Sequence, residues 1–292
     1  KTDFVAIGRG LIADPAWCAK AAGGRVAEIR RCISCLYCID KVFNGAHITC
    51  AVNARAGREI ELGHFKADGD GRTVVVVGGG PAGMEAARVL AKRNFKVILF
   101  EKRAQLGGQL NLGCKPPGKA KMTRLVDYLR HQLELLKVDV RLGSEADAQA
   151  VRAEHPHAVL IATGAGAIIP PIEGIDNANV RLVQDVLADE TAIGGRTVAI
   201  IGAGMTGCET ARLLAAGGKQ VYLVEMLADV ATGAGLSEKM DIVRRMQGET
   251  IEILTHHQVL SIMDGAIKVK DMRDERISRI HVDQVVLAIG MK

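Results

Sequence analysis

Short apolar runs, four or five residues long, alternate along the chain with longer stretches of helical character. The runs at 74–77, 158–162 and 285–289 consist of small and branched apolar residues, as expected for buried strands of a parallel sheet. The stretch at 122–136 places its apolar residues at helical spacing between two of these runs. This alternation predicts an α/β fold.

Two segments depart from this alternation. Residues 258–282 read as short strands joined by Asp264-Gly265 and Asp274-Glu275, which predicts a small antiparallel meander. The run Phe4–Ile7 predicts a buried strand, although nothing precedes it that could pair with it. Because the run at 285–289 also stops close to a terminus, we expect the chain to be part of a longer protein.

One segment occurs twice. Residues 74–102 align without gaps on residues 198–226, and each copy reads as a strand, a glycine turn, a helix and a second strand. The matched positions share the three glycines of the turn and an acid at the end of the second strand. The repeat predicts two related nucleotide-binding folds in one chain.

Both turns have the G-x-G-x-x-G pattern of a dinucleotide-binding fold. The first glycine makes the tight turn, the second lets the backbone approach a pyrophosphate, and the third lets the helix pack closely on the strand. The helix N-terminus supplies N–H donors, and the acid is placed to accept from a ribose hydroxyl. A glycine-rich loop without a ligand is the disfavoured alternative, because strand, helix and acid accompany the motif twice. The candidate residues are Gly78, Gly80, Ala82, Gly83 and Glu101 in the first copy, and Gly202, Gly204, Gly207 and Glu225 in the second.

The surroundings of the two turns favour different nucleotides. A second glycine pair follows the first copy in the run Leu106–Leu110, and it adds Gly108 and Gln109 to the candidate residues. We therefore interpret the first copy as an FAD site. The carboxylate of Glu225 would repel a 2'-phosphate, so the second copy is predicted to bind NADH rather than NADPH.

Four of the seven cysteines lie close together, at Cys32, Cys35, Cys38 and Cys50. Three thiolates within seven residues are closer to iron-sulphur spacing than to the paired knuckles of structural zinc sites. We predict a 4Fe-4S cluster held by these four residues, with a zinc knuckle as the alternative. Cys18, Cys114 and Cys208 show no such spacing and are interpreted as ordinary, partly buried residues.

Composition narrows the classes of function. The formal net charge of +5 is spread in mixed-sign segments and aromatics make up only 3% of the chain, so we do not expect a nucleic-acid partner. No apolar run is long enough for a membrane helix, and the clustered cysteines fit a reducing compartment, which predicts a cytoplasmic protein. No nucleophile elbow supports hydrolytic chemistry.

The chain resembles the iron-sulphur flavin oxidoreductases of the Old Yellow Enzyme group, which include 2,4-dienoyl-CoA reductase, trimethylamine dehydrogenase and 2-enoate reductase. Residues 3–15 look like the last strand and turn of that family's barrel, which implies that Gly8 and Arg9 help to hold an FMN phosphate. Residues 30–38 and 50–53 look like its 4Fe-4S segment, with one residue fewer between the second and third cysteines than the reductase branch often has.

The resemblance implies four parts. Residues 1–24 would be the remnant of an FMN-binding (β/α)8 barrel, 25–70 the 4Fe-4S segment, 71–189 an FAD-binding domain that resumes after 292, and 190–292 the NAD(H)-binding domain. The last two would be nested Rossmann-like domains.

The implied activity is a relay from NADH to FAD, then to the 4Fe-4S cluster and to FMN, ending on an activated C=C bond of an enoate or enoyl-CoA type. The catalytic residues on the substrate side would lie in the barrel before residue 1. The expected partner is a small-molecule substrate, with a homo-oligomer left open. Two alternatives stay open as well: a dehydrogenase of the trimethylamine dehydrogenase type that passes electrons to a carrier protein, and a nucleotide-binding or electron-transfer module without enzymatic activity.

Overall fold

The computed structural model describes residues 2–292, so Lys1, with which the predicted barrel remnant begins, lies outside them. The chain forms two compact units. The first consists of Lys1–Cys114 and Lys121–Gly164, and the second of Lys115–Ala120 and Ala165–Lys292. Each unit contains its own parallel sheet, and each is described by itself below.

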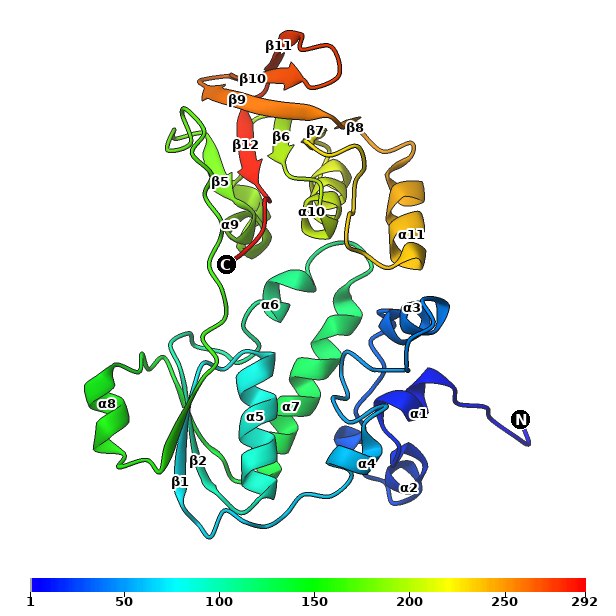
Figure 1. Ribbon diagram of the computed structural model, residues 1–292, viewed down its shortest axis with the longest axis vertical. Coiled ribbons are helices and arrows are strands. Elements are labelled where there is room, and N and C mark those ends of the chain that lie inside the picture. Colours follow the sequence, from blue (N-terminus) through cyan, green and yellow to red (C-terminus); the bar gives the residue numbers. More distant parts are fainter. Residues whose placement is uncertain (1) are drawn as a thin grey trace. The chain divides into compact units, whose positions relative to one another are not determined.

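The sheet of the first unit has four parallel strands in the order β3-β2-β1-β4 (Figure 1). Its strands are β1 (Thr73–Val77), β2 (Lys96–Glu101), β3 (Asp139–Leu142) and β4 (Ala158–Ile161). Successive residues of β1 point to opposite faces, and both Val75 and Val76 are fully buried, so both faces are covered.

Helices α5 (Pro81–Lys92) and α7 (Thr123–Leu135) cover the face that carries Val76, through a core that includes Met84 and Leu129. The other face packs against Val151 of α8 (Ala148–Ala153). The predicted helix at 122–136 and the strand at 158–162 are therefore confirmed, each within one or two residues.

Short helices precede this sheet: α1 (Arg9–Ala13), α2 (Trp17–Ala22), η1 (Val26–Glu28), α3 (Tyr37–Phe43) and α4 (Glu59–Leu62). The predicted strand at 4–7 is wrong, since these residues form no strand and Phe4 is 90% exposed. A strand requires a partner for its backbone N–H and C=O groups, and none of the strands in residues 2–292 pairs with this run.

The second unit has five parallel strands in the order β5-β12-β6-β7-β8. These are β5 (Val180–Leu182), β6 (Thr197–Ile201), β7 (Gln220–Val224), β8 (Ile251–Leu254) and β12 (Gln284–Leu287). The order β8-β7-β6-β12 reproduces β3-β2-β1-β4 of the first unit, which confirms the two related Rossmann-like folds that the repeat predicts.

The predicted meander is confirmed as the antiparallel sheet β9 (His257–Met263), β10 (Ala266–Asp271) and β11 (Ile277–His281). Val259 and Ile267 pack with Ala199 of β6, so the meander covers one face of the parallel sheet. The unit also contains α9 (Val183–Ala188), α10 (Met205–Ala216) and α11 (Leu236–Met246), of which α10 packs on β7. Three short elements complete the two units: α6 (Leu110–Gly113), which belongs to the first unit, η2 (Ala120–Met122) and η3 (Glu190–Ala192).

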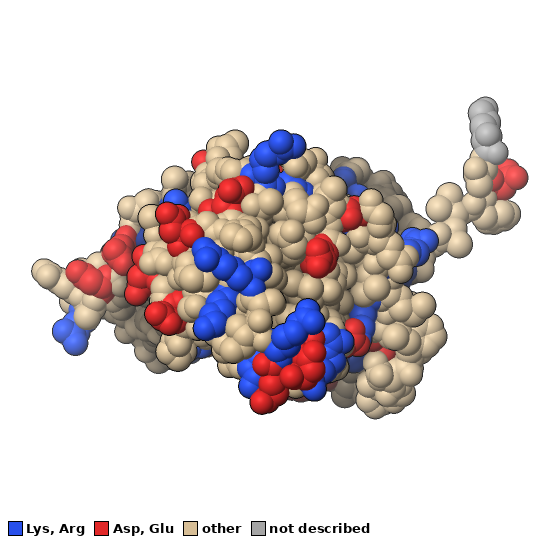
Figure 2. All heavy atoms as spheres, turned by 90° about the horizontal axis from the view of Figure 1, so that it is seen from above, with Lys and Arg blue, Asp and Glu red and all other residues tan. Residues whose placement is uncertain are grey.

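Charges of both signs are interspersed on the face shown in Figure 2. Elsewhere in the described residues, charged side chains form local ion pairs, such as Lys270 with Glu275 at 2.8 Å and Arg273 with Asp271 at 2.6 Å. Within residues 2–292, no helix combines the length and the apolar character that crossing a membrane would require.

Candidate functional site: two dinucleotide turns and a cysteine pocket

The first glycine turn joins β1 to α5, and close packing requires glycine at positions 78 and 83. Gly78 has a φ of +109°, and a side chain there would overlap the carbonyl oxygen of Ala162 after β4. A side chain on Gly83 would overlap the carbonyl oxygen of Gly78. Gly80 caps α5 in extended conformation and is followed by a proline at the first helical position, which suits a helix start.

A second loop lies against this turn. Gly107 donates its N–H to the carbonyl of Gly79 at 2.9 Å, and Leu106 is buried beside it. Gly108 has a φ of +53°, and a Cβ there would lie 2.9 Å from the Cα of Gly80. The structure therefore brings Gly108 and Gln109 to the first turn, as the sequence predicted.

The second turn joins β6 to α10 in the same way. Gly202 has a φ of +100°, and a Cβ there would lie 2.7 Å from the carbonyl oxygen of Ala288, after β12. A side chain on Gly207 would overlap the carbonyl oxygen of Gly202. Gly204 caps α10, and no described atom lies within 4 Å of where its Cβ would be. At both helix starts the first N–H groups have no acceptor within the helix, so they are available to an anion.

Glu101 and Glu225 each accept hydrogen bonds from the backbone of their own glycine turn and stabilise it. The sequence did not reveal this role. Glu101 accepts from the N–H of Gly79 at 2.7 Å and from that of Arg103 at 2.8 Å. Glu225 accepts from the equivalent groups of Ala203 at 2.8 Å and Leu227 at 2.9 Å. Each carboxylate oxygen accepts one N–H in this way and keeps a lone pair for a further donor such as a ribose hydroxyl.

Glu225 therefore allows a prediction that separates its two roles. We expect Glu225→Gln to keep part of the turn and to reduce the preference for NADH over NADPH about tenfold, because the charge that repels a 2'-phosphate is gone. Glu225→Ala should also destabilise the turn by about 1 kcal/mol, since the N–H groups of Ala203 and Leu227 lose their acceptor. Binding titrations with both nucleotides and thermal unfolding measure the two effects, and an unchanged preference in Glu225→Gln would remove the proposed discrimination.

Behind the second turn, Cys208 of α10 is fully buried and donates to the carbonyl of Ala203 at 3.3 Å. Burial raises the pKa of this thiol from 9.0 to about 11. The stability that this shift contributes is complete below pH 9 and is lost as the pH rises through about 11.

Because the thiolate is the reactive form, we expect iodoacetamide at about pH 8 to leave Cys208 of the folded protein unmodified while it labels the exposed Cys18. Peptide mass spectrometry reads out both sites in one sample. Labelling of Cys208 at the rate of Cys18 would contradict the buried, protonated state.

The four clustered cysteines line one cavity. Cys32, Cys35, Cys38 and Cys50 face a space of about 290 Å³, which includes volume open to solvent. Apolar residues make up most of the remaining wall: Ile12, Ile33, Leu36, Ala51 and Val52. The seven cysteines of the chain form no disulfide. The structure thus brings together the four residues that the spacing singled out.

The loop around the first three thiols is held in an unusual conformation. Ser34 and Leu36, on either side of Cys35, have φ values of 60° and 59°, in the left-handed region that non-glycine residues seldom adopt. Ser34 donates its N–H to the sulphur of Cys32 at 3.4 Å. Cys32, Cys35 and Cys38 around these two residues all line the one cavity.

Four thiols are the donor set that an iron-sulphur cluster takes. Within residues 2–292, no three His, Cys, Asp or Glu side chains are arranged to hold a single ion. In a 4Fe-4S cluster each thiolate binds its own iron, so the four sulphurs stand around a cube instead of meeting at one point. The apolar wall also suits a cluster whose potential depends on exclusion of water.

Of the two residues predicted to hold an FMN phosphate, Gly8 precedes α1 and Arg9 begins it. Arg9 lines the cysteine cavity, and its Nη1 is buried with no hydrogen-bond partner among the described residues. A buried guanidinium nitrogen without an acceptor is costly, and an anion beside it would remove that cost. The FMN role of Gly8 and Arg9 remains a prediction.

Three kinds of comparison with known proteins agree. The family described as pyridine nucleotide-disulphide oxidoreductase matches residues 72–292. The NADH oxidase of Thermoanaerobacter brockii is 42% identical over 99% of this chain and 45% of the relative, and the bilirubin reductase of Mediterraneibacter gnavus is 39% identical over 99% and 45%. The structure of a 2-naphthoyl-CoA reductase in complex with 2-naphthoyl-CoA superposes with a TM-score of 0.92, at 32% identity over 97% of this chain and 43% of that chain. The chain thus spans less than half the length of these relatives.

Proposed function

The chain belongs to the pyridine nucleotide-disulphide oxidoreductase family, and we propose that it is the electron-input part of an NADH-dependent iron-sulphur flavoprotein reductase. The observation that carries this proposal is the presence, in one chain, of two dinucleotide turns built alike and a cavity lined by four cysteines. Two nucleotide-binding folds that follow one another along the chain suit hydride transfer from one bound nucleotide to the other. A cluster suits the transfer of single electrons from the reduced nucleotide to a further group.

The residues of the second turn would hold NADH. The first N–H groups of α10 would bind the pyrophosphate beside Gly204, where the backbone is open, and Glu225 would accept from the ribose. The residues of the first turn would hold FAD. There Gly80 and Gly108 approach each other closely, and the N–H groups of Ala82 and Gly83 begin α5.

The four cysteines would hold a 4Fe-4S cluster, and Gly8 and Arg9 would approach an FMN phosphate at the end of a barrel. When bound, NADH would supply a hydride to FAD, the cluster would pass the electrons on one at a time, and FMN would rejoin the pair to reduce a substrate. Relatives named for the reduction of bilirubin and of 2-naphthoyl-CoA support a reductase that acts on an activated C=C bond of the enoate or enoyl-CoA type.

An anaerobic titration with NADH tests this assignment. We expect NADH to bleach the flavin absorbance and then to produce the paramagnetic signal of a reduced cluster, and NADPH to do so far less readily. If dithionite reduced both groups while NADH reduced neither, the input role would be wrong, and the dehydrogenase that delivers electrons to a carrier would be the better account.

A further inference from the structure

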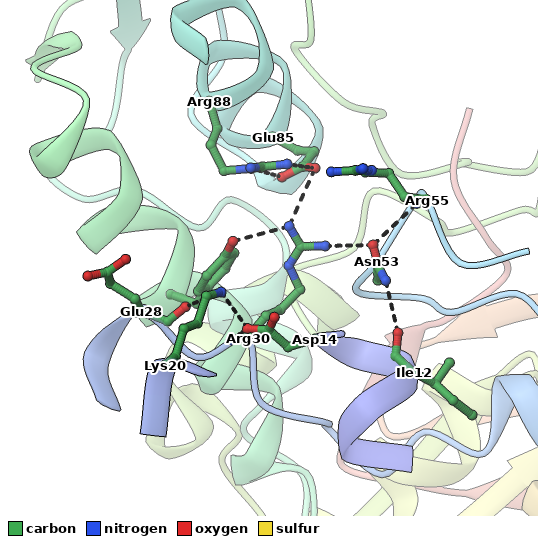
Figure 3. A network of polar contacts seen from close by, with 10 residues as sticks. Ile12, Asp14, Lys20, Glu28, Arg30, Asn53, Arg55, Glu85 and Arg88 are labelled. Carbon is green, nitrogen blue, oxygen red and sulfur yellow. Dashed lines mark hydrogen bonds and ion pairs between the residues drawn. The ribbon is translucent and has the colours of Figure 1, made fainter. Parts of the chain in front are cut away.

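One buried guanidinium lies between the cysteine segment and the two helices of the first dinucleotide fold (Figure 3). Arg30 is only 7% exposed. Its Nη1 donates to Oδ1 of Asn53 at 3.0 Å, and its Nη2 donates to the hydroxyl of Tyr128 on α7 at 3.2 Å. The guanidinium also lies over the ring of Tyr128, 4.8 Å from its centre.

These contacts hold both ends of the cysteine segment. Arg30 comes two residues before Cys32, and Asn53 comes three residues after Cys50. The amide of Asn53 donates to the carbonyl of Ile12 at 2.9 Å, and the N–H of Arg30 donates to Asp14 at 2.8 Å. The Arg30 side chain therefore closes the loop that carries the four thiols, and the Asn53 side chain and the backbone N–H of Arg30 tie that loop to the end of α1.

The same side chain reaches the helix that starts at the first glycine turn. Glu85 of α5 lies 3.9 Å from Nη2 of Arg30, and it accepts both hydrogen bonds of a forked pair with Arg88, at 2.6 and 2.7 Å. From α7, Arg124 donates to the carbonyl of Cys32 at 3.0 Å. The cysteine loop is thus fastened to both helices that pack on this sheet.

The second copy of the repeat lacks this arrangement. Glu209 and Arg212 match Glu85 and Arg88, but Glu209 pairs with Lys119 at 2.5 Å and Arg212 pairs with Glu249 at 3.0 Å. The matched residues have separate partners there, so the shared geometry of the fold does not by itself produce the Arg30 network. The network belongs to the copy that stands next to the cysteine segment.

The charge of Arg30 is poorly compensated. Its two hydrogen-bond acceptors are neutral, and the carboxylate of Glu85 is already shared with Arg88. A guanidinium stays protonated in proteins, and a charge in a buried site is screened far less than one in water. A fixed positive charge beside an iron-sulphur cluster stabilises the reduced, more negative form.

We propose that Arg30 is a positioning residue, which holds the cysteine segment on α5 and α7 and raises the reduction potential of the cluster bound there. The proposal rests on the proposed function and goes beyond it by naming the residue that connects the cluster segment to the first dinucleotide fold. Neither the cysteine spacing nor the glycine motifs include Arg30.

The test compares Arg30→Gln, Arg30→Lys and Arg31→Gln with the parent protein, all prepared anaerobically with flavin. Arg31→Gln removes the same charge one residue away, from an exposed side chain. Three quantities are measured: iron per chain, the cluster midpoint potential by titration followed by paramagnetic resonance, and the rate at which the cluster is reduced after rapid mixing with NADH.

We expect Arg30→Gln to lower the midpoint potential and to slow cluster reduction by about 10- to 100-fold, the range typical of lost outer contacts of a metal site. Arg30→Lys keeps the positive charge but loses the guanidinium that bonds both Asn53 and Tyr128. The midpoint potential of its cluster should therefore stay near the parent value, while the rate of cluster reduction falls. Arg31→Gln should match the parent in all three quantities. Loss of iron from Arg30→Gln but not from Arg31→Gln would also support the positioning role.

If the Arg30→Gln protein held a full cluster and kept both the midpoint potential and the cluster reduction rate of the parent protein, the proposal would be overturned. An equal shift in Arg31→Gln would overturn it too, because local charge alone would then explain the effect. If the parent protein itself held no cluster, the proposed function would fail before any variant was compared, so the two failures are distinguishable.

Discussion

We expect the Cys35→Ala variant to lose its iron and acid-labile sulphide and to keep its flavin and the reduction of that flavin by NADH. Cys35 is one of four thiols around one cavity, and three thiolates leave one iron of a 4Fe-4S cluster without its protein ligand. The two glycine turns do not include Cys35, so the nucleotide sites should persist. Iron and sulphide analysis and an anaerobic NADH titration measure both halves of the result.

Two other cysteines serve as matched controls for this variant. Cys18 is exposed and Cys114 is half-buried, and neither lines the cavity. Cys18→Ala and Cys114→Ala should keep about four irons per chain. A Cys35→Ala protein with a full complement of iron would show that the four residues are not the ligand set.

We expect Gly204→Val to weaken NADH binding by about 10- to 100-fold without lowering the melting temperature, since one charge-assisted hydrogen bond to the pyrophosphate is worth about 1.5 to 3 kcal/mol. Gly204 has a φ of −62° and a ψ of 177°, which any residue adopts. No described atom lies within 4 Å of its missing Cβ, so the added side chain would meet the ligand and not the protein. Calorimetric binding and thermal unfolding test the two statements.

Other glycines of the second unit provide the contrasts for this variant. Gly194 also has open space at its Cβ position and no positive φ, so Gly194→Val should change neither binding nor stability. Gly207→Ala should lower the melting temperature, because its Cβ would overlap the carbonyl oxygen of Gly202. If Gly204→Val bound NADH as tightly as the parent protein, the second turn would not be the NADH site.

Features that depend only on residues close together in the sequence were predictable. The repeated strand, turn and helix revealed both sheets, because the first and third glycines of each copy meet packing demands that only glycine satisfies. The cysteine cavity followed from spacing, since three thiols within seven residues lie close together whatever the rest of the fold does. The meander followed from turn residues between short apolar runs.

Features that depend on distant partners were not predictable. The run at 4–7 has the composition of a strand, but a strand forms only where another strand pairs with it. Arg30 meets Tyr128, 98 residues away, and nothing in either local sequence indicates the contact. The sequence predicts that Glu101 and Glu225 contact a ribose, but it does not predict their hydrogen bonds to the glycine turns. Because both acids recur at the same position of the repeat, a shared structural role could have been suggested.

Our central proposal is that these four cysteines hold a 4Fe-4S cluster beside the first dinucleotide fold. Its most direct test is the content of iron, acid-labile sulphide and zinc per chain in protein purified without oxygen. We predict about four irons and four sulphides per chain, with no stoichiometric zinc. One zinc per chain in their place would contradict the account and leave a nucleotide-binding protein with a structural metal.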